Sequence, residues 1–156
     1  MKTNKFNNRV FHFFVFSMKK FLIIPFVMLF FVSLTCPVVA FDKEDLEKLK
    51  STKKCPKCDL ERANLSGIEL IGANLSYANL SGADLSGASL TWVDLSFADL
   101  ILAIMSKAKL YRTNLRDANL FRANLSKANM SKSNLSGAVL CHTLIPDGKE
   151  DNSGCK

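Results

Sequence analysis

Residues 73–97 read ANLSYANLSGADLSGASLTWVDLSF, which is one five-residue pattern written five times. Leucine returns at every fifth position, a small residue lies two places before it, and Asn, Asp or Ser usually lies between them. The leucine column runs from Leu60 to Ile145, and 15 of its 18 positions are Leu while the others are Met, Met and Ile. No position in the column is polar, so the whole column is predicted to be buried.

A period of five fits neither a regular helix nor a flat strand. On an α-helix the leucines would advance by about 140° per repeat and spiral around every face. On a strand, successive leucines would point to opposite sides because the side-chain period is two. The leucines can share one interior only if the backbone turns a corner in every repeat, as in a solenoid of stacked coils. Asn, Asp and Ser suit such corners because their side chains bond nearby backbone.

The motif A-(N/D)-L-x-x, read as Ala73-Asn74-Leu75-Ser76-Tyr77 and Ala83-Asp84-Leu85-Ser86-Gly87, resembles the pentapeptide-repeat family. Eighteen copies in register carry the resemblance across nearly 90 residues. The resemblance implies an all-β fold, a right-handed quadrilateral β-helix with about four repeats per coil. Stacking at about 4.8 Å would then give four to five coils and a rod on the order of 20 Å long.

The remaining sequence divides into flanking segments. Residues 1–40 are predicted to be an N-terminal extension plus a signal peptide, 41–57 an N-terminal capping segment, 58–146 the β-helix and 147–156 a C-terminal capping tail. The formal charge of +7 is unevenly spread, because five basic and no acidic residues precede residue 41, which leaves 16 basic against 14 acidic in the rest.

The segment from Met18 to Ala40 is typical of a secretory signal. Lys19 and Lys20 precede an apolar run over residues 21–34, and a small-residue site ends at Ala40, after which cleavage is expected. Met18 is the expected start of translation. An uncleaved anchor over 21–40 is the alternative, since the apolar run approaches the roughly 20 residues that span a bilayer. Lipidation at Cys36 is a weaker hypothesis because Thr35 suits it poorly.

Residues 41–54 are predicted to form a short amphipathic helix, with Asp42 as N-cap and Phe41, Leu46 and Leu49 on one face. The open end of a β-helix exposes apolar rungs and unpaired edges. The helix is therefore predicted to cap the first coil, and a tether is the alternative.

The two cysteine pairs are candidates for disulfides. Cys55 and Cys58 could form a structural bridge, a redox pair or half of a zinc site, and their positions in the inward columns favour the structural bridge. The segment from Cys141 to Cys155 resembles the terminal segment of exported family members, in which a bridge would hold the tail over the last coil. His142 has no acid or nucleophile beside it in the sequence and is interpreted as a surface residue.

Two outward surfaces are candidates for binding. If about twenty residues make one coil, large apolar side chains gather as a candidate interaction surface, which comprises Trp92, Phe97, Ile101, Leu102, Tyr111 and Phe121. Basic residues are concentrated toward the C-terminal end of the repeats and form a candidate basic face, which comprises Lys107, Arg112, Arg116, Arg122, Lys127 and Lys132. Such a face could attract outer-leaflet lipid or another polyanion, or could simply be solvated.

These features predict a non-enzymatic, exported scaffold, periplasmic or secreted, with no catalytic, cofactor-binding or metal-binding residues and no cofactor. The expected partners are an unidentified protein or an anionic surface, with nucleic acid disfavoured, a membrane only through the signal or anchor segment, and a monomer or side-by-side homodimer. Two alternatives stay open. One is the topoisomerase-interacting DNA mimicry that the family resemblance implies, which needs an acidic surface, and the other is thiol redox chemistry at Cys55 and Cys58.

Overall fold

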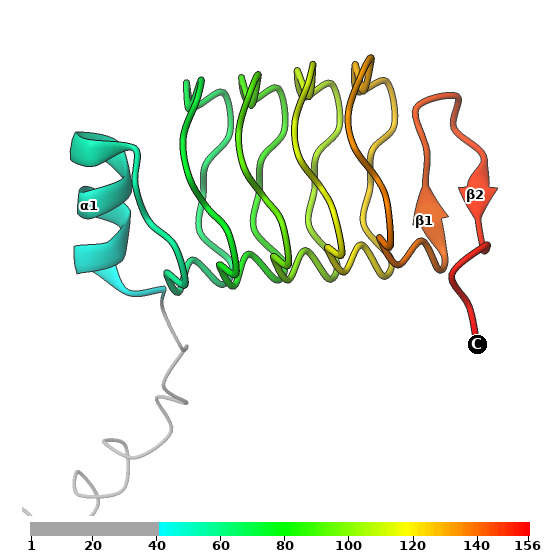
Figure 1. The fold of residues 1–156 in the computed structure, drawn as a ribbon, viewed down its shortest axis with the longest axis horizontal. Coiled ribbons are helices and arrows are strands. Elements are labelled where there is room, and N and C mark those ends of the chain that lie inside the picture. The colour runs from blue at the N-terminus through cyan, green and yellow to red at the C-terminus, as the bar shows by residue number, and fades with distance from the viewer. Residues whose placement is uncertain (1–40) are drawn as a thin grey trace, which may run out of the picture. The chain divides into compact units, whose positions relative to one another are not determined.

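The computed structural model describes residues 41–156. It contains one helix, α1 (Lys43–Thr52), and two short strands, β1 (Thr143–Leu144) and β2 (Glu150–Asp151), with the stacked repeats between them (Figure 1). The expected signal segment, its cleavage after Ala40, the Met18 start and Cys36 lie outside the described residues. Within residues 41–156, no helix is long and apolar enough to cross a membrane.

The repeats form coils of twenty residues. Fifteen isolated parallel bridges each join a residue to the one twenty positions later, from Lys54↔Asn74 to Asn124↔Leu144. The sides of the coils are single bridges rather than extended strands. A tight turn occupies four of every five residues, as the hydrogen bond from Ala63 N–H to the carbonyl of Leu60 illustrates. The residue before each leucine forms the bridge to the neighbouring coil, and the N–H groups of the leucine and of the residue two places after it also donate to that coil.

The interior consists of the two predicted columns. Leucines from Leu60 to Leu125 and the Ala, Val or Thr residues two places before them are almost entirely buried, and Met105 fills its leucine position without exposure. Thr113 and Thr143 replace Ala in the small column, and their hydroxyls donate to the carbonyls of Leu90 and Leu120. A polar group is accepted in this core because a carbonyl of the preceding coil satisfies it.

α1 lies against the start of the repeats. The helix is shorter than the predicted 41–54 and begins after Asp42, whose side chain accepts from Glu44 N–H as the expected N-cap. Leu49 is fully buried in the same core as the leucine columns, and Leu46 and Phe41 pack against it. The Asp45 carboxylate accepts from Asp59 N–H at 2.9 Å, so a helix side chain satisfies a backbone donor of the first repeats.

The other end of the stack is covered by a hairpin. β1 pairs antiparallel with β2, and the connection turns through Pro146-Asp147-Gly148, the predicted turn signal. Beyond β2, Gly154 N–H donates to the carbonyl of Leu140 at 2.7 Å. The hairpin thus begins at Thr143, inside the range 58–146 that was assigned to the repeats, and the last bridge of the stack reaches its residue Leu144.

Candidate interaction surface

From Lys57 to His142, every fifth residue has a positive φ and turns the chain two places after the inward residue. Glycine fills this corner in five repeats, at residues 67, 72, 82, 87 and 137, with φ between 65° and 74°. The third residue of a hydrogen-bonded turn with φ > 0 defines a type II turn, which favours Gly there. Non-glycine residues adopt the same conformation at thirteen corners, namely Lys57, Arg62, Tyr77, Trp92, Phe97, Leu102, Lys107, Arg112, Asp117, Arg122, Lys127, Lys132 and His142.

The corner side chains are exposed in most repeats. Trp92 is 55% exposed, Leu102 56% and Tyr77 54%. A left-handed non-glycine residue costs about 1–2 kcal/mol relative to a right-handed one. The corner position was not predicted from the sequence, although the five glycines that share it with bulky residues are the signal that could have revealed it.

Asn and Asp hold the corners in shape. In most repeats the side-chain oxygen before the leucine accepts from the backbone N–H two residues later, as Asn74 does from Ser76 at 3.0 Å and Asp94 from Ser96 at 3.0 Å. Some of these side chains also bond along the column, as Asn114 Nδ2 does to Asp94 Oδ1 at 2.9 Å. Ile104 cannot make either bond and lies 43% exposed.

The residues of the predicted apolar surface lie on three different sides of the coils. Because twenty residues make a coil, Trp92 and Tyr111 belong to one side, Phe97 to the next, and Ile101, Leu102 and Phe121 to the one after it. Phe97 stacks on Tyr77 with ring centroids 4.8 Å apart. The six residues therefore form no single patch but three small clusters around the stack.

Trp92 and Tyr111 both make cation–π contacts with basic side chains of the same side. The Arg112 guanidinium lies 4.4 Å from the centroid of the Trp92 ring and 5.4 Å from that of Tyr111. Lys132 Nζ lies 5.8 Å from the Tyr111 centroid. Such contacts stabilise by about 0.5–1 kcal/mol at exposed sites. They also fix where the long basic side chains point.

The predicted basic face is likewise divided. Lys107 and Lys127 share one corner column and Arg112 and Lys132 share the next, which confirms the twenty-residue register. Arg116 and Arg122 turn onto the other two sides, where Arg116 pairs with Asp117 at 3.1 Å and Arg122 covers the Phe121 ring. Four of the six predicted residues therefore lie on neighbouring corners, and two lie away from them.

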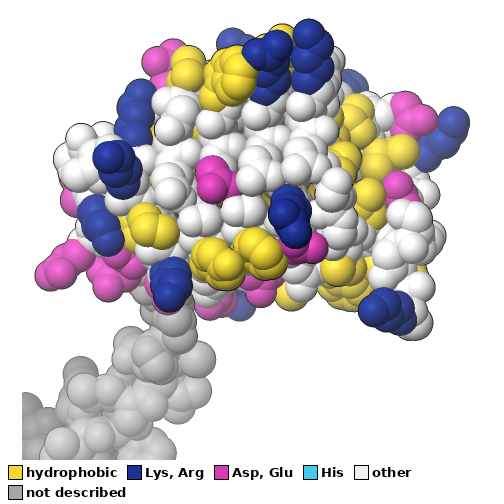
Figure 2. All heavy atoms as spheres, viewed as in Figure 1, with side chains coloured by type: hydrophobic (Ala, Val, Ile, Leu, Met, Phe, Trp, Pro, Cys, Tyr) yellow, Lys and Arg dark blue, Asp and Glu magenta, His cyan; other side chains and the backbone are white. Residues whose placement is uncertain are grey.

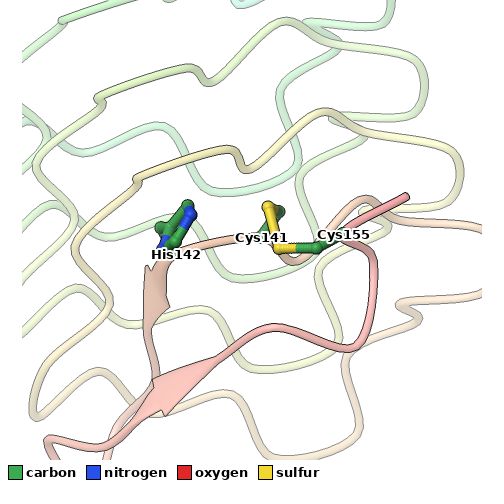
Figure 3. Close-up of side chains that lie close together, drawn as sticks. All are labelled: Cys141, His142 and Cys155. Atoms are coloured by element: carbon green, nitrogen blue, oxygen red, sulfur yellow. A yellow bond between two sulfur atoms is a disulfide. The ribbon is translucent and has the colours of Figure 1, made fainter.

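The cysteines form the two expected pairs, Cys55–Cys58 and Cys141–Cys155, with Cα atoms 5.4 and 4.8 Å apart. Cys55 and Cys58 are 0% and 1% exposed. Asp45 approaches the first pair. His142 approaches the second pair, and Figure 3 shows these three residues. Each set offers three groups that could ligate a metal, but a bridged cysteine has no thiolate to contribute. The first set lies beside α1 and the second beside the β1–β2 hairpin, and Figure 1 shows these two elements at opposite ends of the stack.

His142 does have an acid beside it in the fold, which the sequence analysis missed. Its Nδ1 lies 2.5 Å from an oxygen of Glu150, which approaches through the β1–β2 hairpin. The hydrogen bond with His142 lowers the pKa of Glu150. Both side chains are about half exposed, and their contact joins the residue before β1 to a residue of β2 across the hairpin.

The comparisons with known proteins agree on the repeat. The model of pentapeptide repeats matches residues 57–91, 88–126 and 118–143, in eight copies. These matches span residues 57 to 143 without a gap, more than half of the chain. The chain belongs to the pentapeptide-repeat family, and its coils are those of a right-handed quadrilateral β-helix. A comparison with curated proteins found no match.

Solved pentapeptide-repeat structures are similar over parts of their length. HetL from the cyanobacterium Nostoc, involved in heterocyst differentiation regulation, is 28% identical with a TM-score of 0.32 and shares 63% of this chain and 62% of its own. A protein from the Arabidopsis thaliana thylakoid lumen is 32% identical, with a TM-score of 0.45, over 58% of this chain and 64% of its own. Rfr23 from Cyanothece is 24% identical, with a TM-score of 0.47, over 61% and 92%.

Proposed function

We propose that this protein is a non-enzymatic scaffold of the cell envelope, exported through its N-terminal segment, which presents side-chain columns to a binding partner. In this proposal α1 is the N-terminal cap, the hairpin and its disulfide form the C-terminal cap, and the repeats between them make four to five coils. The coils are rigid because each is bonded to both neighbours along all sides.

The observation that carries the proposal is the use of bulky residues at left-handed corners. Glycine would relieve the strain at each corner, and the exposed Trp92, Leu102 and Tyr77 gain little burial in return. Strained residues that the surrounding structure holds in place cluster at functional surfaces. Binding through these side chains explains why they are present at positions where glycine would remove the backbone strain.

Export is supported by the signal-like segment over 18–40 and by the paired cysteines. Disulfides persist in oxidising compartments and are rare in the cytosol.

The two alternative functions, DNA mimicry and thiol redox chemistry at Cys55 and Cys58, have less support. Residues 107–132 hold seven basic residues and one acidic residue, opposite to the acidic surface that DNA mimicry requires. Thiol chemistry requires an accessible sulfur, and Cys55 and Cys58 are buried beneath α1.

Fractionation of cells that express the full chain tests the location. We expect a periplasmic or secreted species that begins at Phe41 and has no free thiols, whereas a matched chain without residues 1–40 stays in the cytoplasm with reduced cysteines. A full-length chain that remains cytoplasmic and uncleaved, with free thiols, would overturn export.

Site-specific photo-crosslinking tests the scaffold role. A photoreactive residue in place of Phe97 or Leu102, both at corners, should give discrete cross-linked species in the envelope. The control places the same photoreactive residue at Ser86, whose own repeat has Gly87 at its corner and no bulky side chain there. This position should give no discrete cross-linked species. If no corner position yields a discrete product, the columns have no partner and the scaffold role is wrong.

A further inference from the structure

Five cations gather on two neighbouring corners and the side between them. Lys107 stacks below Lys127 and Arg112 below Lys132, and Lys109 lies on the stretch that joins the Lys107 corner to the Arg112 corner. All five side chains are exposed. Because neighbouring coils are about 4.8 Å apart, these residues, here called the cationic side, form two short parallel rows of positive charge.

The cationic side has no acidic partners of its own. None of its five residues forms an ion pair with another residue of the range 41–156, whereas Arg116, on a different side of the same coils, is paired with Asp117. Glu69 shares the column of Lys109 but lies two coils earlier. The positive charge of this side is therefore available to an anion from outside.

Apolar and aromatic side chains continue the same side toward α1. Trp92 precedes Arg112 in its corner column, and Ile71, 49% exposed, lies one coil before Trp92 in the adjacent column, which it shares with Tyr111. Figure 2 shows hydrophobic side chains along the upper edge of the stack, followed toward the hairpin end by Lys and Arg side chains. The guanidinium of Arg112 covers the Trp92 ring and also approaches Tyr111, so aromatic and charged groups form one continuous surface.

A straight surface that combines unpaired cations with exposed Trp and an aliphatic residue fits the headgroup region of a bilayer. Lys and Arg are attracted to anionic lipid, while Trp and Tyr favour the boundary between headgroups and acyl chains. A soluble polyanion would bind the cations, but it would not bury the apolar surface of Ile71 and Trp92. The apolar residues therefore favour a lipid surface over a free polymer.

We propose that the cationic side, with Trp92 and Ile71, docks the scaffold onto a bilayer rich in anionic phospholipid. This inference rests on the proposed function and names the partner of one of its columns. It assigns the lipid contact, which the sequence left open for the whole basic face, to the cationic side with Trp92 and Ile71, separate from any membrane contact through the signal or anchor segment. The protein would lie with this side on the membrane and keep the opposite sides free.

Trp92 is the only tryptophan of the chain, so its fluorescence reports on this side even in the full-length protein. The experiment adds vesicles of phosphatidylcholine, with or without phosphatidylglycerol, to the purified full chain. We expect a blue shift of Trp92 emission, and quenching by brominated lipid, only with the anionic vesicles. Binding should weaken at high salt because the Debye length falls to about 3 Å at 1 M.

Charge-reversal variants identify the surface. Arg112→Glu with Lys132→Glu should weaken vesicle binding by about tenfold or more, since each cation near an anionic surface contributes on the order of 1 kcal/mol. Lys107→Glu with Lys127→Glu should do the same while leaving the Arg112–Trp92 contact intact. Arg116→Glu with Arg122→Glu is the matched control, with the same charge change on the other sides, and should retain binding.

Three outcomes would overturn the proposal. Equal loss in the control pair would mean that net charge, not this side, governs binding. No change of Trp92 emission with anionic vesicles would mean that this side does not meet lipid. Equally tight binding of a short single-stranded DNA, with no preference for vesicles, would reassign the cations to a soluble polyanion. None of these results bears on export or on the cross-links at Phe97 and Leu102.

Discussion

Two positions of the same five-residue repeat behave in opposite ways. The inward leucine is almost invariant and is buried from Leu60 to Leu125, as at Leu95, which has no exposed surface, while the last positions of the column, beside the hairpin, are partly buried. The corner two residues later is held in one backbone conformation in every repeat, yet its residue varies from Gly to Trp and Lys. The inner column contributes stability, and the corner column costs stability while it sets what the surface displays. The fold thus separates the residues that maintain it from those that can be adapted to a partner.

The substitution with the largest expected effect on stability replaces an inner leucine. Leu95→Ala should lower the free energy of unfolding by about 2–5 kcal/mol, because it leaves a cavity between coils that cannot collapse independently. Chemical denaturation measures the loss. Ser86→Ala is the outward control, since the Ser86 hydroxyl makes no hydrogen bond within the described part of the chain, and its effect should be small. A loss below about half a kcal/mol at Leu95 would contradict the buried column.

The second test removes the disulfide at the hairpin end. Cys141→Ser with Cys155→Ser should lower the free energy of unfolding by about 3 kcal/mol. The two cysteines are 14 residues apart in the sequence, and the chain-entropy model gives this stabilisation for a bridge that closes a loop of such a length. The loss should be confined to the last coil and the hairpin, and amide hydrogen exchange should locate it there. Wild-type protein treated with a reductant should match the double variant at the hairpin. Equal loss of protection in the coils beside α1 would show that the stack unfolds as one unit.

Much of the interior was predictable from the sequence, whereas the arrangement of the surface was not. The five-residue period required inward leucines, and the family resemblance implied about twenty residues per coil and therefore the i to i+20 register. The register places residues twenty apart in one column, but it does not show where their long side chains point. Arg112 meets Trp92 because they are twenty residues apart on a corner column, while Phe121, treated with Trp92 as one patch, lies on another side. His142 and Glu150 meet only because the tail returns as a hairpin.

The third test exchanges residues within one corner column. Gly87→Ala should destabilise the protein by about 1 kcal/mol through backbone strain alone, since φ is +65° and an added Cβ would meet no atom within 4 Å. Lys107→Gly, one coil later in the same column with φ of 59°, should stabilise by a similar amount. Thermal and denaturant unfolding measure both. If both substitutions changed stability in the same direction, corner strain would not be the cause.

The smallest expected effect concerns pH and the hairpin. The pKa of the Glu150 carboxyl is lowered from its ordinary value near 4.5, chiefly by the hydrogen bond with His142. A depressed folded-state pKa means that the stabilisation is present above pH 4.5 and is lost as pH falls below that value toward the folded pKa. We expect hydrogen exchange at β1 and β2 to quicken relative to the coils as the solution is acidified through this range.

Glu150→Gln is the control for this pH effect, because it keeps the size of the side chain but removes the titrating carboxyl. The variant should show faster hairpin exchange than the wild type at neutral pH and a weaker acid dependence. The side chains of Glu150 and His142 are both about half exposed, so solvent screening keeps the effect of their contact on stability small. The same acid dependence in the variant would assign it to other groups of the tail, such as Asp151, whose pKa is lowered chiefly by a hydrogen bond from the backbone of Ser153.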